Sequence, residues 1–138
     1  MISIIQYRDN NIMVKYVTSM DEFQTLLQQA GDKLVIVDFF ADWCEPCNNI
    51  APEFERLSEE NPGVVFMYVD VDKCSDIAKA FKVAAMPTFK FIKLNTHYKT
   101  IIGANLPAIK RGIKRYSTAV EVCEKQEGIS TSQCCVIS

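Results

Sequence analysis

Apolar and polar residues follow one another along the chain in blocks that predict a single layered α/β structure. Continuous apolar or β-branched runs predict strands at residues 12–17, 34–40, 64–71, 88–94 and 98–103. Apolar residues spaced three and four apart predict helices at residues 20–30, 44–60, 74–81 and from about 105 onward. The order β-α-β-α-β-α-β-β-α predicts a mixed sheet with helices on both faces.

Boundary signals are clearest around the first helix and the last hairpin. Ser19 is predicted to be an N-cap, with Glu22 reaching back to complete a capping box, and Gly31 ends the helix. Asn95-Thr96 has turn character, so the two strands that flank it are predicted to pair antiparallel. The apolar stripe of the last helix continues to about Lys125.

The length of the chain allows one core. With 138 residues and 49% hydrophobic content, it is too short for two ordinary domains. We therefore divide it into an N-terminal extension (1–12), one α/β domain with a lengthened last helix (13–125) and a polar tail (126–138).

Charge and hydropathy narrow the functional classes. The net charge of −2 gives no reason to expect nucleic-acid binding, which needs a clustered basic face. The apolar N-terminal residues are too few for a signal-peptide core, and no run approaches the length of a membrane span. We expect a cytoplasmic protein, in which disulfides are transient and catalytic.

Two cysteines stand where a predicted buried strand is followed by a helix. Cys44 and Cys47 are three positions apart, a spacing at which two thiols can close and reopen a small disulfide. Cys44 is expected at the helix N-terminus, where free N–H groups and the helix dipole favour a thiolate. Pro46 falls in the first helical turn, where a missing N–H costs nothing. The pattern indicates thiol–disulfide exchange.

The other cysteines form neither a disulfide framework nor a recognisable metal site. Cys134 and Cys135 are adjacent, whereas Cys74 and Cys123 stand alone. A zinc site needs a second ligand pair, and the chain adds only His97 to the adjacent cysteines. We therefore expect no metal ion.

Taken in order, these residues resemble the thioredoxin family over about residues 13–116. The resemblance is carried by Val37-Asp38-Phe39, Trp43-Cys44-Glu45-Pro46-Cys47, Pro52, Val69-Asp70-Val71-Asp72, Met86-Pro87-Thr88-Phe89 and Gly103-Ala104-Asn105. It implies the thioredoxin fold and a protein-disulfide reductase that contributes to cell redox homeostasis. It also implies protein disulfide substrates, no cofactor, and re-reduction by a flavin-dependent thioredoxin reductase. Two segments, 30–35 and 69–74, are similar to the animal cytosolic branch of the family.

The resemblance assigns chemical roles to three residues. Cys44, the more exposed thiol, would attack a substrate disulfide, and Cys47 would resolve the mixed disulfide. Asp38 would lie buried beneath Cys47 and accept or donate a proton, with its pKa raised by burial. The alternative for Asp38 is a strand-end carboxylate that faces water.

The resemblance also implies a substrate-binding surface. Pro87 would follow a cis bond, and the backbone of Met86 would bind an extended substrate; the alternative is a proline that merely begins a strand. Trp43 would form one flank of the surface rather than part of the core, and small residues would form the other. The predicted substrate-binding residues are Trp43, Glu45, Pro46, Met86, Pro87, Gly103 and Ala104.

The site departs from its relatives in charge. Family members usually carry glycine at the position of Glu45, and often lysine or arginine at that of Asn48. Asp42 adds a further carboxylate before Trp43. The sequence therefore predicts a more acidic rim around the thiols.

The printed sequence ends in Cys135-Val136-Ile137-Ser138, a C-a-a-X pattern typical of farnesylation. Cys134 is a candidate for palmitoylation, which would supply a second membrane anchor. The alternatives are a tail without function or an adjacent thiol pair that serves the active site. A lipid would allow a second function, a binding module that holds partners at a membrane. The presence of both redox cysteines and Asp38 favours the enzyme.

Overall fold

The computed structural model describes residues 14–117. The elements are β1 (Val14–Val17), α2 (Met20–Ala30), β2 (Val35–Phe40), α3 (Glu45–Glu60), β3 (Val65–Asp70), α4 (Ser75–Ala80), β4 (Thr88–Lys93), β5 (Thr96–Ile102) and α5 (Leu106–Tyr116). This is the order that the sequence predicts. The predicted extension (1–12), the continuation of the last helix to residue 125 and the tail (126–138) lie outside the described residues, so those boundaries stay predictions.

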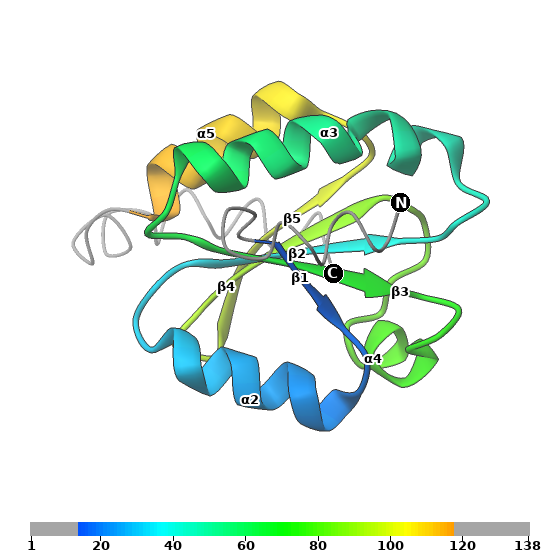
Figure 1. Ribbon diagram of the computed structural model, residues 1–138, viewed down its shortest axis with the longest axis horizontal. Helices are drawn as coiled ribbons and strands as arrows, with labels where there is room; N and C mark the ends of the chain where they lie inside the picture. The colour runs from blue at the N-terminus through cyan, green and yellow to red at the C-terminus, as the bar shows by residue number, and fades with distance from the viewer. Residues whose placement is uncertain (1–13, 118–138) are drawn as a thin grey trace.

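The five strands form one mixed sheet in the order β1-β3-β2-β4-β5. β1, β3 and β2 run parallel, β4 is antiparallel to β2, and β5 is antiparallel to β4. Helices α3 and α5 cover one face of the sheet, and α2 and α4 cover the other (Figure 1). The predicted fold class, a central mixed sheet flanked by helices on both faces, is confirmed.

The central strand β2 is buried on both faces, which explains its unbroken apolar sequence. Its side chains alternate in direction, as in any strand. Val37 and Phe39 pack in the core beneath α2 and α4, whereas Ile36 packs beneath α3 and α5. Asp38 falls in the second series by this alternation. The single charged residue of β2 is thus directed to the layer that contains α3.

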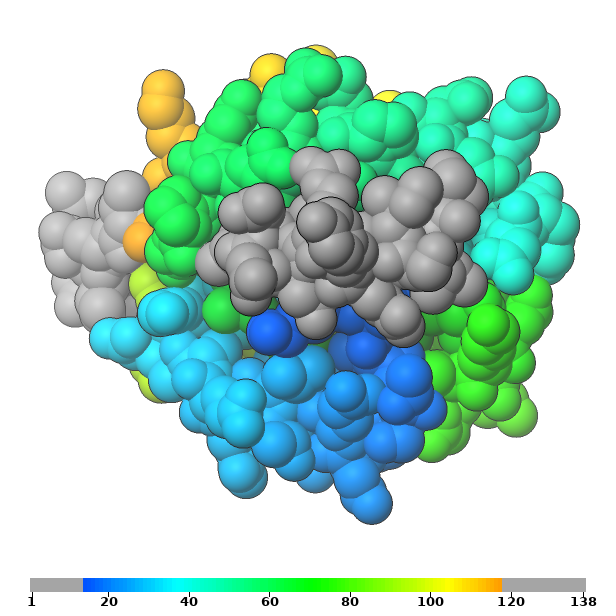
Figure 2. Space-filling view, in the orientation of Figure 1, coloured from blue at the N-terminus to red at the C-terminus, as the bar shows by residue number. Residues whose placement is uncertain are grey.

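The edge strand β1 lies between the two helical layers. In the space-filling view, side chains of α3 lie above those of β1 and side chains of α2 lie below (Figure 2). Tyr16 of β1 is 40% exposed, and its ring centroid lies 4.8 Å from that of Tyr68. Among residues 14–117, no helix has the length and apolarity needed to cross a bilayer.

Helix α5 packs closely on the sheet at Gly112. A Cβ at this position would lie 2.7 Å from two ring carbons of Phe91. Glycine, which lowers helix stability, is thus explained by the close approach of α5 to β4. Ile109, Ile113 and Tyr116 of the predicted apolar stripe are buried beside it.

Two local predictions are corrected. Ser19 Oγ accepts the N–H of Glu22 at 3.0 Å as predicted, but the Glu22 carboxylate accepts from the N–H and hydroxyl of Thr18, each at 2.7 Å, one residue before the predicted partner. The hairpin turns at Leu94 and Asn95, whose φ angles are 54° and 61°, so β5 begins at Thr96. Positive φ is uncommon for leucine, and Leu94 therefore gives no turn signal in the sequence.

Candidate active site

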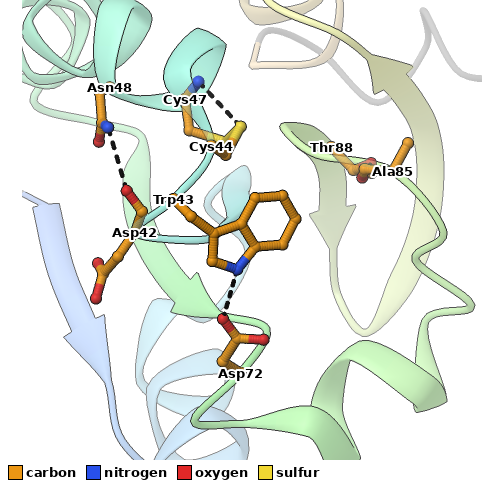
Figure 3. Close-up of a disulfide and its surroundings, with 8 residues drawn as sticks. All are labelled: Asp42, Trp43, Cys44, Cys47, Asn48, Asp72, Ala85 and Thr88. Carbon is orange, nitrogen blue, oxygen red and sulfur yellow. Dashed lines mark hydrogen bonds between the residues drawn. A yellow bond between two sulfur atoms is a disulfide. The ribbon is translucent and has the colours of Figure 1, made fainter.

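The site lies at the carboxyl end of β2, where a short loop leads into α3. Cys44 is the N-cap of α3, Pro46 falls in its first turn, and Cys44 and Cys47 form a disulfide with their Cα atoms 5.3 Å apart. The backbone N–H of Cys47 donates to Sγ of Cys44 at 3.2 Å (Figure 3). The helix N-terminus is therefore directed at the sulfur of Cys44, an arrangement that stabilises a thiolate once the bond opens.

The disulfide is almost enclosed by its neighbours. Cys44 is 5% exposed and Cys47 is 3% exposed. Both pack with Ala41, and Phe40, Val71 and Met86 lie against this cluster. Cys44 is the more exposed cysteine, as predicted, but only slightly. Because both cysteines are nearly buried in the disulfide state, a substrate must dock on the residues around the bond.

One flank of the site is formed by Trp43, which is 70% exposed. Its indole Nε1 donates to Oδ2 of Asp72 at 3.0 Å, and Asn48 Nδ2 donates to the Asp42 carbonyl at 3.3 Å (Figure 3). Trp43 is therefore a surface residue and not a core aromatic, as predicted. Asp72 belongs to a motif noted in the sequence, yet its contact with Trp43 was not predicted.

The opposite flank joins the segment before β4 to the end of β5. The Met86–Pro87 bond is cis. The N–H of Gly103, whose φ is +101°, donates to the Pro87 carbonyl at 2.8 Å. Ile102 pairs with Thr88 across the two strands and is 67% exposed. Ile102 is not among the predicted site residues, although its place as an apolar residue directly before Gly103 was an available signal.

The other predicted surface residues also lie on one or the other of these two flanks. Glu45 and Pro46 are exposed beside the disulfide, and Ala104 is exposed beside Gly103. Met86 is half-buried against the disulfide, Pro87 is buried, and Gly103 is joined to Pro87 by the hydrogen bond described above. The seven residues thus fall on two flanks, and their role in substrate binding stays a prediction.

Asp38 lies in β2 and is 1% exposed. Neither of its carboxylate oxygens has a hydrogen-bond partner within the described part of the chain. Burial raises the pKa of this carboxyl group well above its ordinary value. Its neighbour across the ladder is Tyr68, whose pKa is raised by burial and then by the Asp38 charge. The predicted burial of Asp38 is confirmed, and the water-facing alternative is wrong.

The sequence profile described as Thioredoxin matches residues 14–115. The chain belongs to the thioredoxin family. Thioredoxin from Callithrix jacchus is 47% identical over 104 residues, which cover 75% of this chain and 99% of that protein. Thioredoxin 1 of Plasmodium falciparum is 45% identical over 105 residues, or 76% of this chain and 99% of that protein. The X-ray structure of Fasciola hepatica thioredoxin has a TM-score of 0.73 at 39% identity and covers 74% of this chain and 98% of that chain.

Membership of the thioredoxin family and the CxxC disulfide together identify the protein as a thiol–disulfide oxidoreductase. The predicted enzyme class and reaction are confirmed. The alternative of a lipid-tethered binding module gains no support from the fold or from the relatives.

The remaining cysteines lie apart from this chemistry or beyond the described range. Cys74 is 2% exposed, its Sγ donates to the Val17 carbonyl at 3.5 Å, and burial raises its pKa. These surroundings are those of an unreactive buried thiol. Cys123, Cys134 and Cys135 lie outside the described residues.

Proposed function

We propose that this thioredoxin reduces protein disulfides with Cys44 as the nucleophile and Cys47 as the resolving thiol. The observation that carries the proposal is the position of the disulfide, with Cys44 as N-cap of α3 and the Cys47 N–H directed at its sulfur. The helix terminus favours negative charge on Cys44, the residue that must form the first bond.

The exchange proceeds in two balanced steps. The Cys44 thiolate attacks one sulfur of the substrate disulfide and displaces the other as a thiolate. Cys47 then loses its proton and attacks Sγ of Cys44, which releases the substrate's second sulfur and closes the Cys44–Cys47 disulfide. Two electrons pass from the protein to the substrate.

Asp38 is proposed to accept the proton of Cys47 and to return it in the reverse reaction. Its support is a buried carboxyl group without a hydrogen-bond partner among the described residues, on the face of β2 that is covered by α3. Burial raises its pKa, so this carboxyl group holds a proton at a higher pH than an exposed aspartate does.

Substrate segments are proposed to bind in extended form across the flanks of the disulfide. Met86 packs against the disulfide cluster, and the cis bond to Pro87 precedes the first residue of β4. An extended segment would pair with the backbone of Met86 as an added strand. Gly103 and Ala104 would leave room for its backbone.

A flavin-dependent thioredoxin reductase is proposed to restore the dithiol after each turnover, in the cytoplasm. A reducing compartment suits the proposal because a reductase needs its own cysteines as free thiols. A lipid on Cys135, with a second on Cys134, is proposed as an additional membrane anchor. Mass analysis of the C-terminal peptide from native cells tests the anchor: an unmodified peptide that retains Val136-Ile137-Ser138 rules it out.

Trapping the mixed disulfide tests the order of attack. A Cys47→Ser variant should accumulate a covalent adduct with an oxidised peptide, because the resolving thiol is missing, and the adduct should map to Cys44 by mass spectrometry. Cys44→Ser should accumulate none, and Cys74→Ser should turn over like the wild type. An adduct formed by Cys44→Ser through Cys47 would reverse the proposed roles.

A further inference from the structure

The rim around the disulfide has an acidic side next to Trp43. Asp42 and Glu45 are exposed on either side of the Trp43-Cys44 pair. Asp72 is exposed too, and its carboxylate accepts the indole N–H of Trp43 (Figure 3). Lys73, the next residue after Asp72, is exposed and basic. Three exposed carboxylates against one ammonium group leave this flank with an excess of negative charge.

The two segments that form the other side of the rim contain no charged residue. The segments 83–88 and 102–109 contain no Asp, Glu, Lys or Arg. They are joined by the bond from the Gly103 N–H to the Pro87 carbonyl. Ile102 is 67% exposed on this side, and Ala85 and Ala104 are also exposed. An apolar surface therefore lies across the disulfide from a negative one.

The difference between the negative and the apolar side of the rim can select among substrates, because the disulfide is almost enclosed and a substrate must contact the rim to reach it. A substrate disulfide reaches Cys44 only when its flanking residues lie on the rim. Lysine or arginine next to a substrate cysteine is attracted by the carboxylates, and its cation can also make a cation–π contact with the exposed face of Trp43. Glutamate or aspartate at the same place is repelled.

Building on the proposed reductase function, we infer that the site prefers disulfides flanked by basic residues on one side and apolar residues on the other. The reaction is the two-step exchange given above, with the substrate's charge acting on docking and not on the electron balance. Exposed rim charges act chiefly on the association rate and are screened by salt. We expect a preference of about three- to tenfold at low ionic strength.

Three synthetic peptides with one intramolecular disulfide test the inference. They share one sequence with an apolar residue on one side of the disulfide, and carry Lys, Gln or Glu on the other. The pre-reduced protein is mixed with each peptide, quenched with acid, and the second-order rate constant is obtained from the chromatographic loss of oxidised peptide. Each rate is divided by the rate with dithiothreitol, which removes the intrinsic reactivity of the peptide.

The Lys-to-Glu rate ratio should be about three to ten in low salt and should approach one at about 0.5 M salt. Glu45→Gln should lower the ratio about twofold or more. Asp32→Asn is the matched control, because Asp32 is exposed in the turn before β2, at the opposite end of that strand from the disulfide (Figure 1). It removes the same charge far from the rim and should leave the ratio unchanged.

Two results overturn the inference. One is a wild-type ratio near one at low salt, and the other is an equal fall in Glu45→Gln and Asp32→Asn, which would assign the effect to net charge. Both leave the reductase function intact, because the Gln peptide is still reduced. If none of the three peptides were reduced, that result would instead contradict the proposed function.

Discussion

The indole Nε1 of Trp43 donates a 3.0 Å hydrogen bond to Oδ2 of Asp72, although the ring is 70% exposed. The bond connects the loop after β2 to the turn after β3, two adjacent parallel strands. Asp72 is in turn positioned by its own N–H, which donates to Oδ1 of Asp70 at 2.9 Å. An aromatic ring beside the disulfide is thus held by its edge, and its face is left free for a substrate.

Removing the acceptor should release the ring. In Asp72→Ala, the steady-state fluorescence anisotropy of Trp43 should fall, because the ring loses the hydrogen bond of its indole N–H. Trp43 is the only tryptophan of the chain, so its emission needs no correction. Asp72→Asn keeps an acceptor oxygen and should retain most of the anisotropy. Equal anisotropy in the wild type and in Asp72→Ala would show that the bond does not hold the ring.

Replacement of the buried Asp38 should change how stability depends on pH. Above the unfolded-state pKa of about 3.9, the folded protein keeps the Asp38 proton that the unfolded chain has lost. The free energy of unfolding therefore falls by about 1.4 kcal/mol per pH unit until the raised folded-state pKa is passed. Asp38→Asn cannot ionise and escapes this loss. In denaturant titrations of the disulfide form, the free energy of unfolding of the variant should increase relative to that of the wild type as the pH rises from 4. Parallel pH curves would contradict the raised pKa.

The same substitution should slow turnover. Without a proton acceptor beneath α3, the rate of peptide reduction in Asp38→Asn should fall by about 10²-fold near neutral pH. One ionisation should also disappear from its pH–rate profile, an effect that altered packing alone would not produce. Asp32→Asn provides the control for loss of an exposed carboxylate. An unchanged rate and profile in Asp38→Asn would remove Asp38 from the proposed proton transfer.

A methyl group added to α5 should destabilise the fold. Gly112→Ala places a Cβ 2.7 Å from the Phe91 ring, which is buried and has no free end to move aside. We expect a loss of about 1–3 kcal/mol, more than the gain in helix propensity. Gly63→Ala is the control, because its Cβ would meet no atom within 4 Å, and it should stay within about 0.5 kcal/mol of the wild type. A neutral Gly112→Ala would mean that α5 can move away from the sheet.

Local sequence patterns were sufficient to predict the architecture. The unbroken apolar run of β2 predicts a strand buried on both faces, and Val37 and Ile36 do pack on opposite sides. The two predictions that were wrong, the hairpin turn and the capping-box partner, also concern local structure. Leu94 adopts a positive φ that leucine rarely shows, and the pairing of Glu22 with Thr18 depends on side-chain geometry that a capping motif leaves open.

The active site was predictable where its residues carry their chemistry within a short segment. Cys44 and Cys47 are recognised by spacing. Asp38 is the one charge in an apolar strand, but its buried role came from the resemblance to the thioredoxin family. Asp72 and Ile102 were missed because their positions depend on distant partners. Trp43 precedes Asp72 by 29 positions, and Ile102 reaches the site through its pairing with Thr88.

Insulin reduction in the presence of dithiothreitol measures the central claim most directly. Cleavage of the interchain disulfides of insulin makes the solution turbid, and wild-type protein should greatly accelerate this. Cys44→Ser should return the rate to that of dithiothreitol alone, because the variant lacks the thiol at the N-terminus of α3 that is proposed to begin the exchange, whereas Cys74→Ser should retain full activity. Wild-type protein without any acceleration, or a Cys44→Ser variant as active as the wild type, would contradict the account.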